Sequence, residues 1–158
     1  MLAKLGKLTP PGVGEEPAST TRLGDWYANR LNLGRTRMIL CTSERSLLSV
    51  IVPAKDLPGL PGRLADALAY LLDQIGVPDA AITRELREMQ WVRFAPTASR
   101  RVLGHMNDFA FSVEHRASLG EGPLYMSDLA EQLAGTPCGS MDYARPRDVA
   151  ADLLRSAR

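Results

Sequence analysis

One stretch of the chain places an acid, a base and a hydroxyl at helical spacing. His105, Asp108 and Ser112 share a helical row with Arg101. Members of a catalytic triad come from different elements because the nucleophile and the base must converge on a substrate, whereas neighbours on one helical row project in parallel. This row therefore does not predict nucleophilic catalysis.

A metal site and a free thiol are the next candidates for chemistry. A zinc site would need His105, His115, Asp108 and Cys138, but the two histidines are ten residues apart and face different sides of a helix. Cys138 could act as a nucleophile only beside a base such as His105, and no activating signature surrounds it. We predict a structural cysteine, no metal site and no cofactor.

The sequence SRRVLGHMNDF over residues 99–109 predicts a helix with two different faces. Its core-facing stripe contains Val102, Met106, Phe109 and Val113. Its other side combines Arg100, Gly104, Asn107 and Phe111. Because Gly104 costs about 1 kcal/mol relative to alanine in a helix, another segment should approach closely there. We interpret the helix as covered on both faces and pinned by buried Asn107 and Asp108; the alternative is a ligand or catalytic pocket beside these two residues.

A second polar segment lies nearer the N-terminus. Asp25 can cap a short helix over residues 26–31 that ends near Gly34, and Trp26 and Asn29 would then share one helical face. Trp26 is interpreted as a core anchor, with an exposed stacking platform for a base or ligand as the alternative.

These motifs carry a resemblance to a known family. The sequences WYAN at 26–29, SRRVLGHMNDF at 99–109 and TPCG at 136–139 together resemble a bacterial family of small uncharacterised proteins, a domain of unknown function, over residues 24–139. In that family the positions of Arg101 and His105 are usually small and polar, so the resemblance does not support catalytic roles for these two. It implies no activity, and it singles out a polar cluster made of Trp26, Asn29, Arg100, Asn107 and Asp108.

Composition limits the classes of protein that remain. With 158 residues, 45% hydrophobic and 23% charged, the chain is long enough for one globular domain with its own core. A net charge of +1 gives no broad electrostatic footprint for nucleic acid. No apolar run reaches the roughly 18 residues of a membrane span, and two cysteines do not make a disulfide framework. We expect a cytoplasmic protein with no membrane partner.

The remaining patterns predict an α+β fold, in which a small, mainly antiparallel sheet packs against several helices. Strands are expected as a central hairpin at 38–41 and 47–52, at 90–95, and as an edge strand near 2–8, and helices at 60–75, 79–89, 100–115, 127–134 and 146–154. The solvated side of the second helix should carry Arg84, Glu85, Arg87 and Glu88. Residues 9–21 are typical of an exposed linker, so residues 1–23 are assigned to an N-terminal strand and flexible linker and 24–158 to a single α+β domain.

Three functions remain open. We favour a small bacterial interaction or regulatory module without catalysis, which binds an unknown protein partner or forms a homo-oligomer through an exposed apolar patch. An enzyme of unknown reaction would need Asn107, Asp108 and Arg100 to line a polar pocket with Trp26 and Asn29. A nucleic-acid-binding protein would need its candidate arginines on one face beside an aromatic residue. These arginines are Arg35, Arg37, Arg100 and Arg101.

Overall fold

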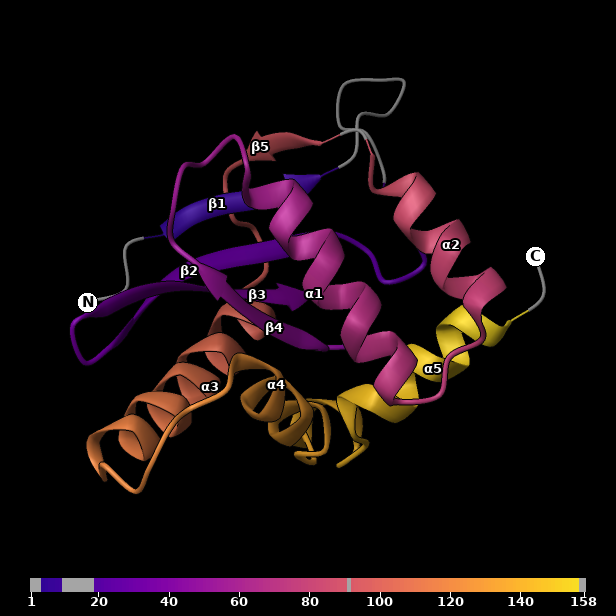
Figure 1. Cartoon of the computed structure of the whole chain (residues 1–158). Helices are drawn as coiled ribbons and strands as arrows, with labels where there is room; N and C mark the ends of the chain where they lie inside the picture. Colours follow the sequence, from indigo (N-terminus) through magenta and orange to yellow (C-terminus); the bar gives the residue numbers. More distant parts are fainter. Residues whose placement is uncertain (1–3, 10–18, 91, 157–158) are drawn as a thin grey trace.

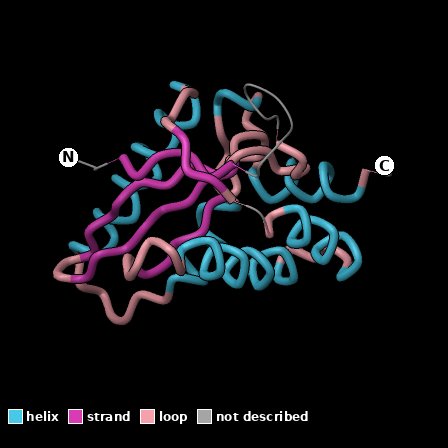
Figure 2. The backbone as a smooth tube through the Cα atoms, turned by 90° about the horizontal axis from the view of Figure 1, so that it is seen from above, coloured by secondary structure: helices cyan, strands magenta, loops and turns pink. Residues whose placement is uncertain are grey.

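The described strands form one antiparallel sheet. The computed structural model describes residues 4–9, 19–90 and 92–156. Five strands are paired in the order β4-β3-β2-β1-β5, each antiparallel to its neighbour. Figure 2 shows the strands, in magenta, lying side by side. They are β1 (Lys4–Thr9), β2 (Trp26–Leu33), β3 (Thr36–Ser43), β4 (Ser49–Pro53) and β5 (Arg93–Ala95). The predicted α+β class and mainly antiparallel sheet are confirmed.

Each described α-helix overlaps a predicted one. The helices are α1 (Leu60–Gln74), α2 (Asp79–Glu88), α3 (Arg100–Ser118), α4 (Met126–Ala134) and α5 (Pro146–Arg155), and a short 3-10 helix, η1, covers Gly139–Met141. Helix α1 lies on one face of the sheet and α3 on the other, and α4 lies beside β4 (Figure 1). Helical periodicity therefore located these elements well.

Side chains along each strand alternate between the two faces of the sheet, and this divides the interior into two cores. Trp26 and Ala28 point to one face of the sheet, and Tyr27 and Leu31 point to the other. Side chains of α1, α2 and α5 fill the first core, while side chains of α3 fill the second. Helix α4 contributes to both, because it lies beside the edge strand β4.

The helix predicted over residues 26–31 is wrong, because this segment is strand β2. Most of the strand is buried on both faces, so it lacks the polar alternation that marks a half-exposed strand. Gly34 does not end a helix. It has φ +63° and begins the two-residue loop between Leu33 and Thr36, a position that favours glycine in a tight hairpin.

The other strand predictions differ only in detail. The central hairpin is confirmed as β3 and β4, although β4 is an edge of the sheet. Strand β1 was expected at an edge, but it pairs with both β2 and β5. The strand predicted at 90–95 is shortened to β5. Of the linker predicted at 9–21, residues 10–18 lie outside the described residues.

Candidate functional site

Three sets of contacts hold helix α3 along strand β2: hydrogen bonds at its N-cap, an apolar stripe along its length and a hydrogen bond near its C-terminal end. The Ser99 side chain accepts a hydrogen bond from the Val102 N–H at 3.3 Å, and the Ser99 N–H donates to Tyr27 Oη at 3.2 Å. Toward the other end, the Asn32 N–H donates to Glu114 Oε1 at 3.4 Å. The predicted apolar stripe is buried against β2 and β3: Val102, Met106, Phe109 and Val113.

The outer face of α3 is the surface opposite this stripe, and the described chain leaves it open. It is formed by Arg100, Gly104, Asn107, Asp108, Phe111 and His115. A Cβ atom added at Gly104 would meet nothing within 4 Å, and Asn107 and Asp108 are exposed. The expectation that another segment covers this face and buries these two side chains is therefore wrong. Pattern reasoning detected the unusual face but assigned its cover to the same chain.

Phe111 is the largest apolar group on the outer face. Its side chain is 74% exposed. Its ring is stacked on His115, with centroids 6.2 Å apart and an angle of 6° between the planes. Leu119, the residue that follows α3 and lies one turn beyond His115, is also exposed. This end of α3 therefore exposes two large apolar side chains, Phe111 and Leu119.

The polar cluster selected from the sequence does not come together. Trp26 and Asn29 are each 2% exposed, but they lie in different cores, because side chains three apart on a strand point to opposite faces. Trp26 Nε1 and Asn29 Oδ1 have no hydrogen-bond partner among the described residues. Arg100, Asn107 and Asp108 remain outside, on α3. The five residues thus occupy two buried places and one exposed surface.

A contact that sequence reasoning missed joins α3 to the loop after α4. His105 Nε2 lies 2.6 Å from Ser140 Oγ. Burial, with Arg101 as a second cause and Asp108 opposing, lowers the pKa of His105 below its usual value. A neutral imidazole can accept the proton of a serine hydroxyl, which is the first step of acyl transfer. No carboxylate in the described part of the chain hydrogen-bonds the ring to orient it, so we assign this pair as a contact that fastens the loop.

The same loop contains Cys138, which is buried. Its Sγ donates to the Thr136 carbonyl at 3.4 Å, and burial raises the pKa of its thiol. Burial also raises the pKa of Cys41 to about 12. Both cysteines are free thiols. Their protonated form is favoured, which fits the structural role predicted for Cys138. Within the described residues no group of three or more histidine, cysteine and acidic side chains could hold a metal ion.

A buried carboxylate ties helix α2 to the segment before β2. Glu85 was expected on the solvated side of α2, but it is 2% exposed. Its two oxygens accept the Arg22 and Leu23 backbone N–H groups, each at 3.0 Å. Burial raises the pKa of this carboxyl, although the two N–H donors act in the opposite direction. The expectation failed because helical periodicity cannot show that a distant backbone segment needs an acceptor.

The candidate arginines lie at opposite ends of α3. Arg100 and Arg101 are in its first turn, where the Arg101 guanidinium donates to the Glu44 carbonyl at 2.6 Å. Arg35 lies in the turn between β2 and β3, and Arg37 lies at the start of β3, paired with Asn32 beside its contact with Glu114. About 20 Å of helix separates the two pairs, so they form no single cluster of positive charge.

The fold and the site together define an α+β domain with an uncovered helical face. The chain belongs to a family described as a domain of unknown function (DUF6933), which it matches over residues 1–149. No curated protein and no solved structure matches it. The match includes β1 as well as the motifs on β2 and α3. None of the helices in the described ranges combines the length and hydropathy needed to cross a membrane.

Proposed function

We propose that this protein is a small interaction module that binds a protein partner through the outer face of α3, without catalysis. The observation that carries the proposal is Phe111, which is 74% exposed on a face that the described chain leaves uncovered. Burying such a side chain contributes about 1.5–3 kcal/mol, and here that gain is left for binding. Exposed aromatic residues of this kind are frequent anchors of protein interfaces.

Gly104 supports the same proposal independently. A glycine within a helix lowers stability by about 1 kcal/mol relative to alanine, and no contact within 4 Å of its missing Cβ compensates. A second helix can approach closely at a glycine, because no side chain holds the two backbones apart. The cost to the isolated chain is thus offset when a partner is bound.

The two alternative functions lack a matching observation. An enzyme using Asn107, Asp108 and Arg100 needs them to line a pocket with Trp26 and Asn29, and these two are buried elsewhere. A nucleic-acid-binding protein needs its arginines on one surface, and the two pairs lie at opposite ends of α3. Neither is proposed here.

We place the module in the cytoplasm of a bacterium. The bacterial source rests on the resemblance of the WYAN and SRRVLGHMNDF motifs. The location is supported by Cys41 and Cys138, which are both free and buried, as is usual where thiols stay reduced.

Photo-crosslinking inside cells tests the proposal. The full chain is produced with benzoylphenylalanine at Asn107, which is exposed on the outer face, or at Asp66, which is exposed on α1. Position 107 should give a discrete protein adduct, and position 66 should not. Phe111→Ser in the same chain should remove the adduct, while circular dichroism shows an unchanged fold.

The result that overturns the proposal is equally definite. If position 107 gives no adduct, or gives one that survives Phe111→Ser unchanged, the outer face does not bind a partner through Phe111. An adduct of equal yield from position 66 would show non-specific contact and would have the same consequence.

A further inference from the structure

We infer that the partner is a second copy of this chain, bound by antiparallel pairing of the two α3 helices with Gly104 at their crossing point. This inference rests on the proposed function, because it names the partner of the same outer face.

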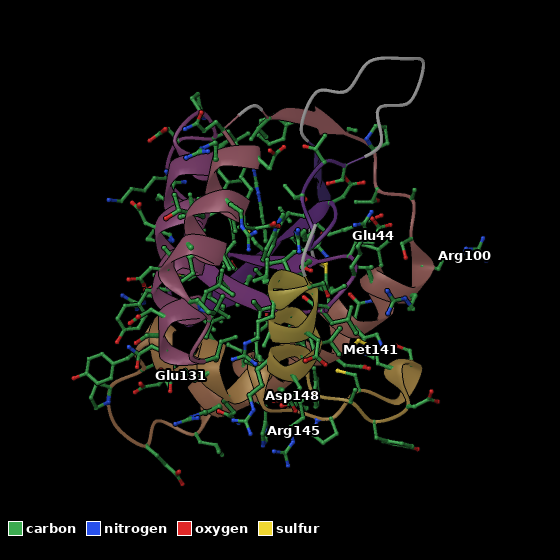
Figure 3. All side chains as sticks on the ribbon, turned by 90° about the vertical axis from the view of Figure 1, so that its right-hand side faces the viewer. Glu44, Arg100, Glu131, Met141, Arg145 and Asp148 are labelled. Atoms are coloured by element: carbon green, nitrogen blue, oxygen red, sulfur yellow. The ribbon has the colours of Figure 1, made fainter. Side chains whose placement is uncertain are left out.

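The charges on the outer face are arranged for self-pairing. Arg100 lies four residues before Gly104, and Asp108 lies four residues after it. Figure 3 shows Arg100 projecting away from the body of the molecule. In a twofold antiparallel pair centred on Gly104, Arg100 of each copy is level with Asp108 of the other. A parallel pair would set like charges level, so the antiparallel arrangement is favoured.

The shape of the face fits the same arrangement. Gly104 leaves room for the second helix, since a Cβ there would meet nothing within 4 Å. Phe111 lies seven residues beyond Gly104, about 10 Å along the axis, so it reaches past the first turn of the second copy's helix, which begins at Arg100, to the segment around position 97 that leads into that helix. Pro96 and Ala98 on either side of that position are exposed. Each Phe111 ring can thus pack on this short apolar segment of the other copy.

The size of the contact sets the strength of the dimer. Stable interfaces bury about 1,200–2,000 Å² in total, and one pair of helix faces provides less. The complex is therefore transient and depends on concentration. Such a dimer closes on itself, because the same surface patch is used on both copies and no second binding face remains.

Sedimentation of the purified full chain over a range of concentrations tests the inference. Asp108→Arg should weaken self-association about tenfold or more, and Arg100→Asp should do the same. The double variant Arg100→Asp, Asp108→Arg should recover much of the wild-type association, because each altered charge again meets its opposite. The matched control Asp66→Arg changes the same charge on α1 and should leave association unchanged.

Gly104→Leu tests the crossing point without relying on charge. It should abolish self-association while thermal melting stays at or above the wild-type temperature, because leucine favours a helix and its Cβ would meet nothing within 4 Å at this exposed position. A wild-type chain that stays monomeric at every concentration overturns the inference, as does a charge swap that fails to restore association. If position 107 cross-links only to a different protein, self-pairing is wrong and the proposed function stands. If it cross-links to nothing, both fall.

Discussion

The Phe111 ring is stacked on His115 one helical turn away, with centroids 6.2 Å apart and planes inclined by 6°. Both side chains are exposed, and the ring contact between them is formed within the single chain. A pair of side chains that is already ordered in the free chain loses little conformational entropy on binding. The imidazole lies beside the ring and leaves most of it open, because Phe111 remains 74% exposed.

Exposure of Asn107 sets the first expectation. Asn107→Ala should change the free energy of unfolding by less than about 0.5 kcal/mol, because the side chain is exposed. Phe109→Ala, which removes a buried ring from the same helix, should cost about 3–5 kcal/mol. Urea unfolding of both variants makes the comparison. A loss above 1 kcal/mol for Asn107→Ala would show that it pins the fold after all.

The exposure of Asn107 and Asp108 reverses the sequence prediction that both are buried, and the reason is physical. The core stripe of α3 followed from helical periodicity, because burial on one side imposes the 3.6-residue repeat. The polar face carried a second signal, the cost of Gly104, which required some compensating contact. A sequence cannot say whether that contact lies in the same chain or in another, so Asn107 and Asp108 were assigned to the interior.

Glu85 provides a test of the contact between α2 and the segment before β2. Glu85→Ala removes the acceptor of the Arg22 N–H, which is partly buried, and of the Leu23 N–H, which is buried. Leaving such donors unpaired costs about 1–3 kcal/mol. Denaturant unfolding at constant pH measures this loss. A variant as stable as the wild type would mean that water replaces the carboxylate without penalty.

The raised pKa of Glu85 also gives a pH dependence with a definite sign. Because the folded state holds this proton more tightly than the unfolded state, stability should fall as pH rises from about 4.5 to the raised folded value, and should level off above it. Glu85→Gln, which cannot titrate, should lack this decrease. The comparison is made by melting both proteins at a series of pH values, and identical slopes would contradict it.

His105 should act in the opposite direction. Its folded pKa is lowered, so the unfolded state binds the proton more readily, and stability should fall as pH drops from 6.5 to the lowered folded value. His105→Gln should remove this part of the pH profile. Ser140→Ala serves as the control, because it removes the hydroxyl contact but leaves the imidazole to titrate. If both variants keep the wild-type profile, His105 is not the titrating group.

Side chains of the first core give a direct measure of packing. Leu68→Ala and Leu72→Ala should each cost about 2–5 kcal/mol, because both residues are fully buried between α1 and the sheet. Denaturant unfolding measures the loss. Values below 0.5 kcal/mol for both variants would show that α1 packs differently.

The limits of sequence reasoning lie where distant segments meet. Helix α1 was found correctly because a one-sided leucine pattern marks a helix that packs against a sheet. Strand β2 was misread because Trp26 and Ala28 fill one core and Tyr27 and Leu31 the other, which erases the alternation that reveals a strand. The contact between His105 and Ser140 joins residues 35 positions apart, and no local pattern encodes it.

Radical footprinting of Phe111 tests the central claim most directly, because it asks whether the outer face of α3 is open in the isolated chain and covered in the cell. In dilute purified protein Phe111 should be labelled readily, and in the producing cell its labelling should fall severalfold. Tyr70, exposed on α1, is the internal reference and should be labelled equally in both. Equal labelling of Phe111 in the two settings would contradict the claim, since it would show that no partner covers this face.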